Sequence, residues 1–237
     1  IIVNKHLIPS LGSITLHKFR PNHIESYYTD KRKSGNAVTG EGLSNQTIKH
    51  HHRVLSEAIN YAVRMQRVAR NVCDSVRPPK IDTKEMHFLN EDQIIQVLET
   101  SKGSRYYELY YLAIWTGMRR SELLGLRWGD IDNLTISVNQ VAHHIEGGEM
   151  VYTEPKTNSS KRTLDIHPRT ALMLQEYKQS KEQMGIVCKD NDVVFTDPDG
   201  SLLLPDTVSH CFRKLMRELG IQDVRFHDLR HTHATMM

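Results

Sequence analysis

Apolar residues recur at helical spacing through the first 80 residues of the chain. The segment Pro21–Lys33 begins with a proline, which suits the first turn of a helix, and ends before Ser34-Gly35, which favours a stop. Ser44 is a suitable N-cap for a second helix. The apolar positions of that helix repeat three or four residues apart: Ile48, Val54, Leu55, Ile59, Ala62 and Val63. The pattern predicts a helical domain over residues 1–80.

The polar residues 81–87 predict a linker, which follows a Pro-Pro-Lys stop and leads to a second domain at residues 88–237. In this domain, helical patterns alternate with short strand-like segments. We expect helices that begin at the Asn90–Gln93 capping box and over residues 106–115, 168–184 and 207–219. We expect strands over residues 134–141, 151–154 and 163–166. The predicted fold class is mainly α, with a small antiparallel β-sheet in the second domain.

The charge of the chain is concentrated in its first third. The formal net charge is +3, yet residues 1–80 hold 13 Lys and Arg against five acids, and the remainder holds 18 against 23. A basic region is the electrostatic signature of binding to a phosphate backbone, although a solvated helical surface is the alternative. Lys49 and Arg53 are four residues apart and share a helix face, and we take them with Arg64 as candidate DNA-binding residues.

The composition is that of a globular protein. The 237 residues are 38% hydrophobic and 25% charged, enough for two modest domains with cores of their own. No apolar run has the length of a membrane span, and the first residues lack a signal-peptide pattern. Cys73, Cys188 and Cys211 are scattered without metal-ligand spacing. We therefore expect a cytoplasmic protein with reduced thiols and no membrane partner.

Two short segments of the second domain combine an arginine with an apolar helical pattern. Arg119 and Glu122 are three residues apart, so the carboxylate can hold the guanidinium in one orientation. His227 and Arg230 have the same spacing. A guanidinium binds two phosphate oxygens at once and stays charged at any working pH. If the two arginines meet in space, they form a clamp for one phosphodiester.

Each segment also has a simpler interpretation. Arg119 and Glu122 could form an ordinary surface ion pair, which contributes little. His227 and His231 have the spacing of metal ligands, and a core histidine is commoner than either a ligand or a catalyst. Against a metal, Arg230 would lie beside the ion, and no matching ligands occur nearby. We therefore expect no metal site and prefer the phosphate clamp.

The segment Thr116–Trp128, Thr-Gly-x-Arg-x-Ser-Glu-Leu-Leu-x-Leu-x-Trp, together with Pro155-Lys156-Thr157 and His227-Asp228-Leu229-Arg230, resembles the tyrosine recombinases, the phage-integrase family. The resemblance implies a helical core-binding domain at residues 1–80 and a mixed α+β catalytic domain at residues 88–237. It implies four catalytic residues and a supporting Glu122: Arg119, Lys156, His227 and Arg230.

The resemblance also implies the reaction. Lys156, on what the pattern predicts to be a β-hairpin, would protonate the departing 5′ oxygen, with Lys161 as its competitor on the same hairpin. His227 would manage the proton at the attacking oxygen. A tyrosine would form a 3′-phosphotyrosyl link that keeps the energy of the broken bond, so no cofactor is needed. The implied enzyme is a site-specific recombinase of a phage or other mobile element, with four protomers assembled on two sites of double-stranded DNA.

The sequence departs from the family pattern at the nucleophile. The last of its nine tyrosines is Tyr177, well before His227, and none follows the His-x-x-Arg segment. The chain stops at Met237. We therefore expect a catalytic domain that is incomplete at its C-terminal end and binds DNA without cleaving it.

Two other classes of function stay open. A non-catalytic DNA-binding module derived from such a recombinase would lack the tyrosine, although the other four residues argue against degeneration. A metal-dependent nuclease or transposase could use Asp130 and Asp132, although Trp-Gly-Asp-Ile-Asp is typical of a turn that leads into a strand. The run His50-His51-His52 cannot chelate one ion, because consecutive helical residues point in different directions, and we expect a solvated face there.

Overall fold

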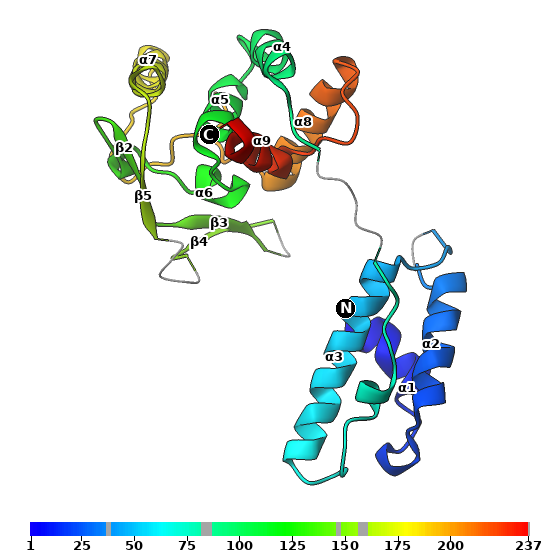
Figure 1. Ribbon diagram of the computed structural model, residues 1–237. Helices are drawn as coiled ribbons and strands as arrows, with labels where there is room; N and C mark the ends of the chain where they lie inside the picture. Colours follow the sequence, from blue (N-terminus) through cyan, green and yellow to red (C-terminus); the bar gives the residue numbers. More distant parts are fainter. Residues whose placement is uncertain (37–38, 82–86, 146–147, 156–160, 237) are drawn as a thin grey trace. The chain divides into compact units, whose positions relative to one another are not determined.

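The computed structural model describes residues 1–36, 39–81, 87–145, 148–155 and 161–236. The chain divides into two compact units, Ile1–Lys84 and Glu85–Met237, and each is described by itself (Figure 1). Most of the predicted linker lies outside the described residues. The described residues are mainly helical with small antiparallel sheets in the second unit, so the predicted fold class is confirmed.

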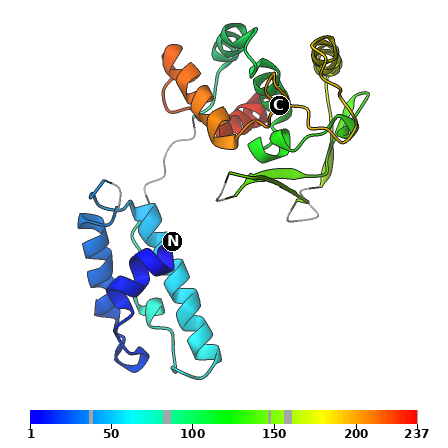
Figure 2. The same cartoon turned by 180° about the vertical axis from the view of Figure 1, so that it is seen from behind.

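Two long helices, α2 and α3, form the first unit together with shorter helical turns. Its elements are η1 (Val3–Leu7), α1 (Ile8–Leu11), η2 (Leu16–Lys18), α2 (Pro21–Lys33), α3 (Asn45–Arg64) and η3 (Val72–Ser75). The long helices lie side by side (Figures 1 and 2). Both were predicted: α2 has the expected bounds, and Ser44 Oγ accepts a hydrogen bond from the Thr47 backbone N–H at 3.2 Å where α3 begins. Ile24 and Ile48, both fully buried, lie in the core of this unit.

The three consecutive histidines of α3 point in different directions, and the prediction of a solvated face is wrong for two of them. His51 is 1% exposed, and its Nδ1 lies 2.7 Å from the Tyr27 hydroxyl. His52 is half-buried and hydrogen-bonds the hydroxyl of Tyr28. His50 is exposed. Because successive helical residues are about 100° apart, two of the three turn toward α2.

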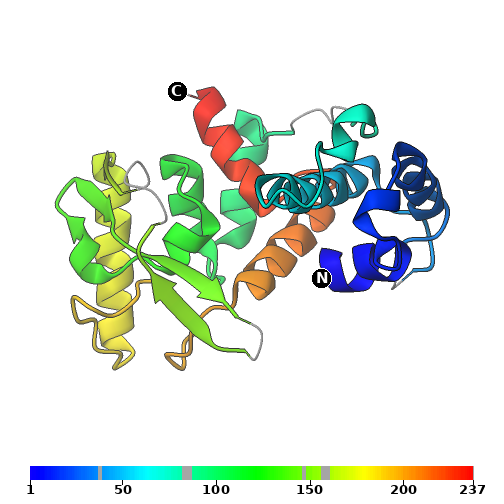
Figure 3. The same cartoon turned by 90° about the horizontal axis from the view of Figure 1, so that it is seen from below.

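The second unit is built around α5 (Tyr107–Thr116), which is apolar on most sides and has six of its ten residues buried, in line with the burial predicted for this segment. The other helical elements are α4 (Glu91–Ser101), α6 (Arg120–Leu124), η4 (Trp128–Asp130), α7 (Pro168–Gln183), α8 (Pro205–Glu218), η6 (Phe226–Asp228) and α9 (Leu229–Met236). α4, α6, α7 and α9 all contact α5. α7 lies on one side of α5 and α8 on the other (Figures 1 and 3). Among the described residues, no helix is both long and apolar enough to cross a membrane.

The strands of the second unit form two separate antiparallel sheets. They are β1 (Ile131–Asp132), β2 (Thr135–Val138), β3 (Val141–His144), β4 (Met150–Thr153) and β5 (Arg162–Asp165). One sheet has the order β1-β2-β5, with Ile136 opposite Ile131 and Leu164, and the other pairs β3 with β4.

Two strand predictions are corrected. The single strand expected at residues 134–141 is two strands, because Asn139 and Gln140 leave the ladder: Asn139 Nδ2 donates to Asp130 at 2.8 Å, and Gln140 Nε2 donates to the Gly125 carbonyl at 2.8 Å. The expected hairpin around Lys156 is also wrong in its pairing. β4 pairs with β3 and β5 with β2, so the strands on either side of Lys156 belong to different sheets.

Lowering the pH should destabilise the first unit through His51. Burial, followed by the nearby charges of His6 and Lys31, lowers the pKa of His51 from 6.5 to about 4. Between these two pKa values, His51 is protonated in the unfolded chain and neutral in the folded unit. This contribution to stability is intact above about pH 6.5 and is lost as the pH falls toward 4, by an amount on the order of 3 kcal/mol. Chemical unfolding of the first unit, followed by circular dichroism from pH 7.5 to 4.5, measures the loss.

The matched variants are His51→Asn and His50→Asn on the same helix. Asparagine at position 51 keeps a polar atom near Tyr27 but cannot take up the proton, so its unfolding free energy should depend less on pH. His50 is exposed and is the last of the causes that lower the pKa of His51, so its replacement should change the pH dependence much less. Identical pH profiles for the two variants would exclude His51 as the cause.

Candidate functional site

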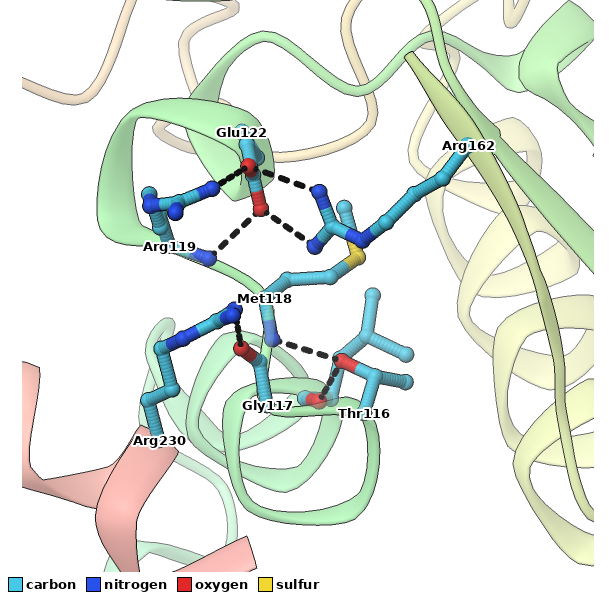
Figure 4. Close-up of polar contacts among 8 residues, drawn as sticks. Thr116, Gly117, Met118, Arg119, Glu122, Arg162 and Arg230 are labelled. Carbon is cyan, nitrogen blue, oxygen red and sulfur yellow. Dashed lines mark hydrogen bonds and ion pairs between the residues drawn. The ribbon is translucent and has the colours of Figure 1, made fainter. Parts of the chain in front are cut away.

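The turn between α5 and α6 is where the two arginine segments meet. α5 ends at Gly117, whose φ of 59° is left-handed. The Gly117 carbonyl accepts a hydrogen bond from Arg230 Nη1 at 2.7 Å (Figure 4). Farther along α9, Nδ1 of His233 lies 3.1 Å from the carbonyl of Ile114. α9 is thus docked on the backbone that precedes Arg119, and this contact brings together residues more than 100 positions apart.

Glu122 organises Arg119 as the sequence predicted, but it also holds a second arginine. Glu122 Oε2 accepts the backbone N–H of Arg119 at 2.8 Å, and Oε1 accepts Nη1 of the Arg119 guanidinium at 2.8 Å. Arg162, at the start of β5, donates Nη1 to Oε1 at 2.9 Å and Nη2 to Oε2 at 2.8 Å (Figure 4). The Glu122 side chain is 1% exposed. It is therefore a buried carboxylate shared by two guanidinium groups, not a surface ion pair.

The charges around Glu122 leave an excess of positive charge. Burial by itself raises the pKa of Glu122, but the hydrogen bonds from Arg162 and Arg119 outweigh it and lower the pKa to about 2. Burial and then the charges of Arg119 and Arg162 lower the pKa of Arg230. One carboxylate thus lies among three guanidinium groups, and an anion at this place would be strongly favoured.

An open cavity of about 660 Å³ borders this cluster. Two of the predicted catalytic residues, Arg119 and His227, line it. Its wall contains three further arginines: Arg120, Arg213 and Arg225. Arg119 keeps 47% of its side-chain surface exposed, so its guanidinium is accessible. The structure therefore places Arg119 and His227 on the wall of a cationic cavity, with Arg230 close to Arg119 at the Gly117 turn (Figure 4). This arrangement is suited to holding a phosphodiester.

The His227 ring lies on the wall of the cavity. Burial, followed by the charge of His231, lowers its pKa, so the ring is neutral and can accept a proton. The rings of His227 and His231 meet edge to face with centroids 5.9 Å apart. In the part of the chain that the structure describes, no third His, Cys, Asp or Glu joins this pair in a cluster able to hold a metal ion.

The predicted general acid, Lys156, lies outside the described residues. Its competitor Lys161 is exposed, and its Nζ forms an ion pair with Glu154 at 2.8 Å. Arg162, which stands next to Lys161, was not predicted from the sequence. Its charge alone did not indicate a functional role, because a charged residue at the end of a strand is ordinarily solvated.

One of the two acids of the nuclease hypothesis, Asp130, has a structural role. Both oxygens of Asp130 are occupied: Arg127 donates its backbone N–H and Nε to one and Nη2 to the other, each at 3.1 Å, and Asn139 adds a bond at 2.8 Å. Four bonds fill the acceptor capacity of a carboxylate. Asp132 accepts a hydrogen bond from its neighbour Asn133 at 2.9 Å. Asp130 is thus a helix cap and not an open metal ligand.

The candidate DNA-binding residues of the first unit lie on α3. Helical spacing places Lys49, Arg53 and Arg64 on one face, opposite the face that carries Ile48 and Leu55. Arg53 and Arg64 are exposed, and Lys49 is half-buried. Arg64 forms an exposed ion pair with Glu57 at 3.1 Å, so part of its charge is already compensated.

Comparisons with known proteins identify the family of the chain. Residues 85–237 match the phage integrase family. A tyrosine recombinase XerC-like protein of Caldanaerobacter subterraneus subsp. tengcongensis is 30% identical, over 90% of this chain and 59% of that protein. The ICEBs1 integrase of Bacillus subtilis is 27% identical, over 100% of this chain and 64% of that protein. The chain thus spans about three fifths of the length of these curated relatives.

Solved structures share the fold. The Tn1549 transposon integrase in complex with transposon right end DNA superposes with a TM-score of 0.80 at 22% identity, covering 95% of this chain and 75% of that chain. A lambda integrase tetramer bound to a Holliday junction superposes with a TM-score of 0.69 at 19% identity, covering 98% of this chain and 63% of that chain.

Replacing Gly117 with alanine should disturb the docking of α9. A Cβ at this position would lie 2.7 Å from Cδ2 of His233, and the backbone φ of +59° is unfavourable for any L side chain. Gly103 is the control, because it has a φ of +75° and nothing within 4 Å of its Cβ position. We expect Gly103→Ala to lower the free energy of unfolding by about 1 kcal/mol. Gly117→Ala should lower it by roughly 1–3 kcal/mol more, because the His233 ring must move. Equal losses in urea unfolding would contradict this contact.

Proposed function

Because the chain belongs to the phage integrase family, we propose that it carries the phosphate-binding part of a site-specific DNA recombinase, the integrase of a phage or other mobile element. The observation that carries this proposal is that Arg230 lies close to Arg119, which lines a cationic cavity (Figure 4). Each guanidinium can donate two parallel N–H bonds to phosphate oxygens. Such a pair would stabilise the extra negative charge that a phosphodiester gains in its transition state.

The proposed reaction divides the remaining roles among the predicted residues. A tyrosine oxygen attacks phosphorus and loses its proton toward His227, while the bond from phosphorus to the 5′ oxygen breaks. Lys156 gives that leaving oxygen a proton. The product is a 3′-phosphotyrosyl link and a free 5′ hydroxyl, and the reverse sequence on another strand rejoins DNA. The sequence from Arg230 to Met237 contains no tyrosine, so the role proposed for residues 1–237 is to supply the groups that hold the phosphate.

We propose double-stranded DNA as the partner, with the first unit as a core-binding domain and the second as the catalytic domain. The solved Tn1549 and lambda integrases were determined with DNA, and one lambda structure is a tetramer on a Holliday junction. By this likeness, four protomers would assemble on two sites. The compartment implied is the cytoplasm, where the DNA of a bacterial host lies.

A non-catalytic DNA-binding module is the second candidate, and the exposed arginines of α3, Arg53 and Arg64, support it. Such a module would need the basic face of α3 but not the buried Glu122 or the convergence of Arg119 and Arg230. Covalent attachment to DNA by the full-length protein that carries this sequence distinguishes the two candidates.

The clamp residues should matter far more for chemistry than for binding. In the full-length protein, Arg119→Ala or Arg230→Ala should slow covalent attachment to DNA by at least about 100-fold, because each removes a preorganised donor to the transition state. Duplex affinity should fall by less than about 10-fold, since many phosphate contacts share the binding. Denaturing gels measure attachment, and fluorescence anisotropy measures affinity. Arg169→Ala, at an exposed position on α7, is the control. Unchanged attachment in both clamp variants would refute their role.

The α3 face should account for part of the salt dependence of binding. We expect the variant with alanine at Lys49, Arg53 and Arg64 to bind a random-sequence duplex with a shallower slope of log K against log salt, by about 0.9 for each phosphate that the variant no longer neutralises. The control removes the same charge at exposed positions of the second unit: Lys102, Arg169 and Lys189. A slope that changes equally in both triple variants would mean that net charge, and not this face, determines binding.

A further inference from the structure

Among the described residues of the second unit, three arginines have their backbone N–H bound by the carboxylate of the acid three residues later. The pairs are Arg119 with Glu122, Arg127 with Asp130, and Arg225 with Asp228. In each pair the buried carboxylate accepts the backbone N–H of its arginine, at 2.8, 3.1 and 2.8 Å respectively. The backbone part of the three turns is therefore alike.

The guanidinium part differs. Arg127 and Arg225 each direct Nε and Nη2 onto the two oxygens of their own acid, with all four distances at 3.1 Å. We call this arrangement, in which two N–H groups of a guanidinium bind the arginine's own acid, a closed fork. Arg119 instead gives Glu122 a single side-chain bond, from Nη1. The guanidinium that makes two bonds to Glu122 is that of Arg162, which donates from β5 to both carboxylate oxygens at 2.9 and 2.8 Å.

We infer that Arg162 is a positioning residue: by occupying both oxygens of Glu122, it prevents Arg119 from closing its fork and leaves Arg119 N–H groups directed to the cavity. This inference rests on the proposed function, in which those N–H groups bind a phosphodiester. In this role Arg162 does not contact DNA.

The burial of the three side chains supports an indirect role. The side chain of Arg162 is 23% exposed, against 47% for Arg119. Arg119 lines the cavity, and Arg162 is not among the described residues of its wall. Glu122 lies between them with a side chain that is 1% exposed (Figure 4). A substitution at position 162 can therefore change the anion site most directly through Glu122 and Arg119.

The bonding capacity of Glu122 gives the physical reason. Two bonds from Arg119 and two from Arg162 fill its acceptor sites. Without Arg162, a buried carboxylate would lose two charged donors, and the nearest replacement is the rest of the Arg119 fork. Arg119 would then resemble Arg127, with its guanidinium bound and neutralised by its own acid. Arg119 would remain in the site, but its guanidinium N–H groups would no longer be available to a phosphate.

The test uses residues 1–237 and a random-sequence 20-base-pair duplex, with the slope of log K against log salt as the readout. Each phosphate that the protein ceases to neutralise reduces the slope by about 0.9. We expect Arg119→Ala to show this reduction. Arg162→Met should show the same reduction, and the double variant should show no more than either single one. Arg127→Met is the matched control, because it removes one charge from the same kind of turn; its slope should stay that of the unchanged chain.

A second mutation should reverse the first. Replacing Glu122 with glutamine in the Arg162→Met variant removes the charge that captures Arg119, so the slope should return toward that of the unchanged chain. This double variant has a neutral amide in place of the unpaired buried carboxylate. It can therefore be measured even if Arg162→Met alone fails to fold. Arg162→Lys keeps the charge without the fork, and it should give a slope nearer that of Arg119→Ala.

The outcomes separate the inference from the proposed function. If Arg119→Ala reduces the slope while Arg162→Met and Arg162→Lys leave it unchanged, the positioning role is refuted and the clamp stands. If Arg119→Ala itself leaves the slope unchanged, the clamp fails. A further fall on adding glutamine at position 122 would also overturn the capture of Arg119.

Discussion

The buried carboxylate of Glu122 is the interaction on which the candidate site depends. An isolated charge in the interior is strongly unfavourable, and it is tolerated here because two guanidinium groups and a backbone N–H surround it. In return it joins three segments: the start of α6, the turn before it and the first residue of β5. Removing Arg162, which supplies two of the four hydrogen bonds, would leave the buried charge poorly satisfied, a change that is strongly destabilising. The position of Arg119 is therefore tied to the stability of the unit.

The core of the second unit supplies the other requirement, the nearness of α9. α5 is buried, and α9 packs along it with Leu229 in the core. Two polar contacts then fix the register: Arg230 donates to the Gly117 carbonyl, and Thr232 Oγ1 accepts the backbone N–H of Leu89 at 3.0 Å. The apolar contacts bring the two arginine segments near each other, and the hydrogen bonds fix the register in which Arg230 contacts Gly117. Neither set alone would place Arg230 beside Arg119.

Local features of the fold were predictable from the sequence, and long-range ones were not. The Pro21 start of α2, the Ser44 cap of α3 and the Asn90 capping box of α4 depend on neighbouring residues, and the structure has all three. The break between β2 and β3 depends on where Asn139 and Gln140 find partners, at Asp130 and Gly125. Alternation of apolar and polar residues carries no information about such partners, so one strand was predicted in place of two.

The candidate site shows the same division. The two arginine segments were recognisable, because spacing of three residues places Arg119 with Glu122, and His227 with Arg230, on common faces. Arg162 and the burial of His51 could not be found in this way. Arg162 lies 40 residues from the acid it binds, and His51 is buried by contact with α2, from which it is separated by a loop. A side chain acquires such a role from the surface that packs against it.

The three arginine–acid turns of the second unit differ in the partners that their acids find elsewhere in the chain. Their local sequence pattern and their backbone hydrogen bonds are the same, and both Arg119 and Arg225 line the cavity. Yet Arg127 and Arg225 each give two guanidinium bonds to their own acids, while Arg119 gives one. The difference lies in a further group, supplied by β5 at one turn and by Asn139 at another. The Asn139 amide adds one bond to Asp130, and Arg127 keeps both of its guanidinium bonds to that acid. At Glu122, Arg162 makes the two guanidinium bonds, and Arg119 makes only one. The chemistry available to an arginine in this protein is thus set by what else its acid must bind.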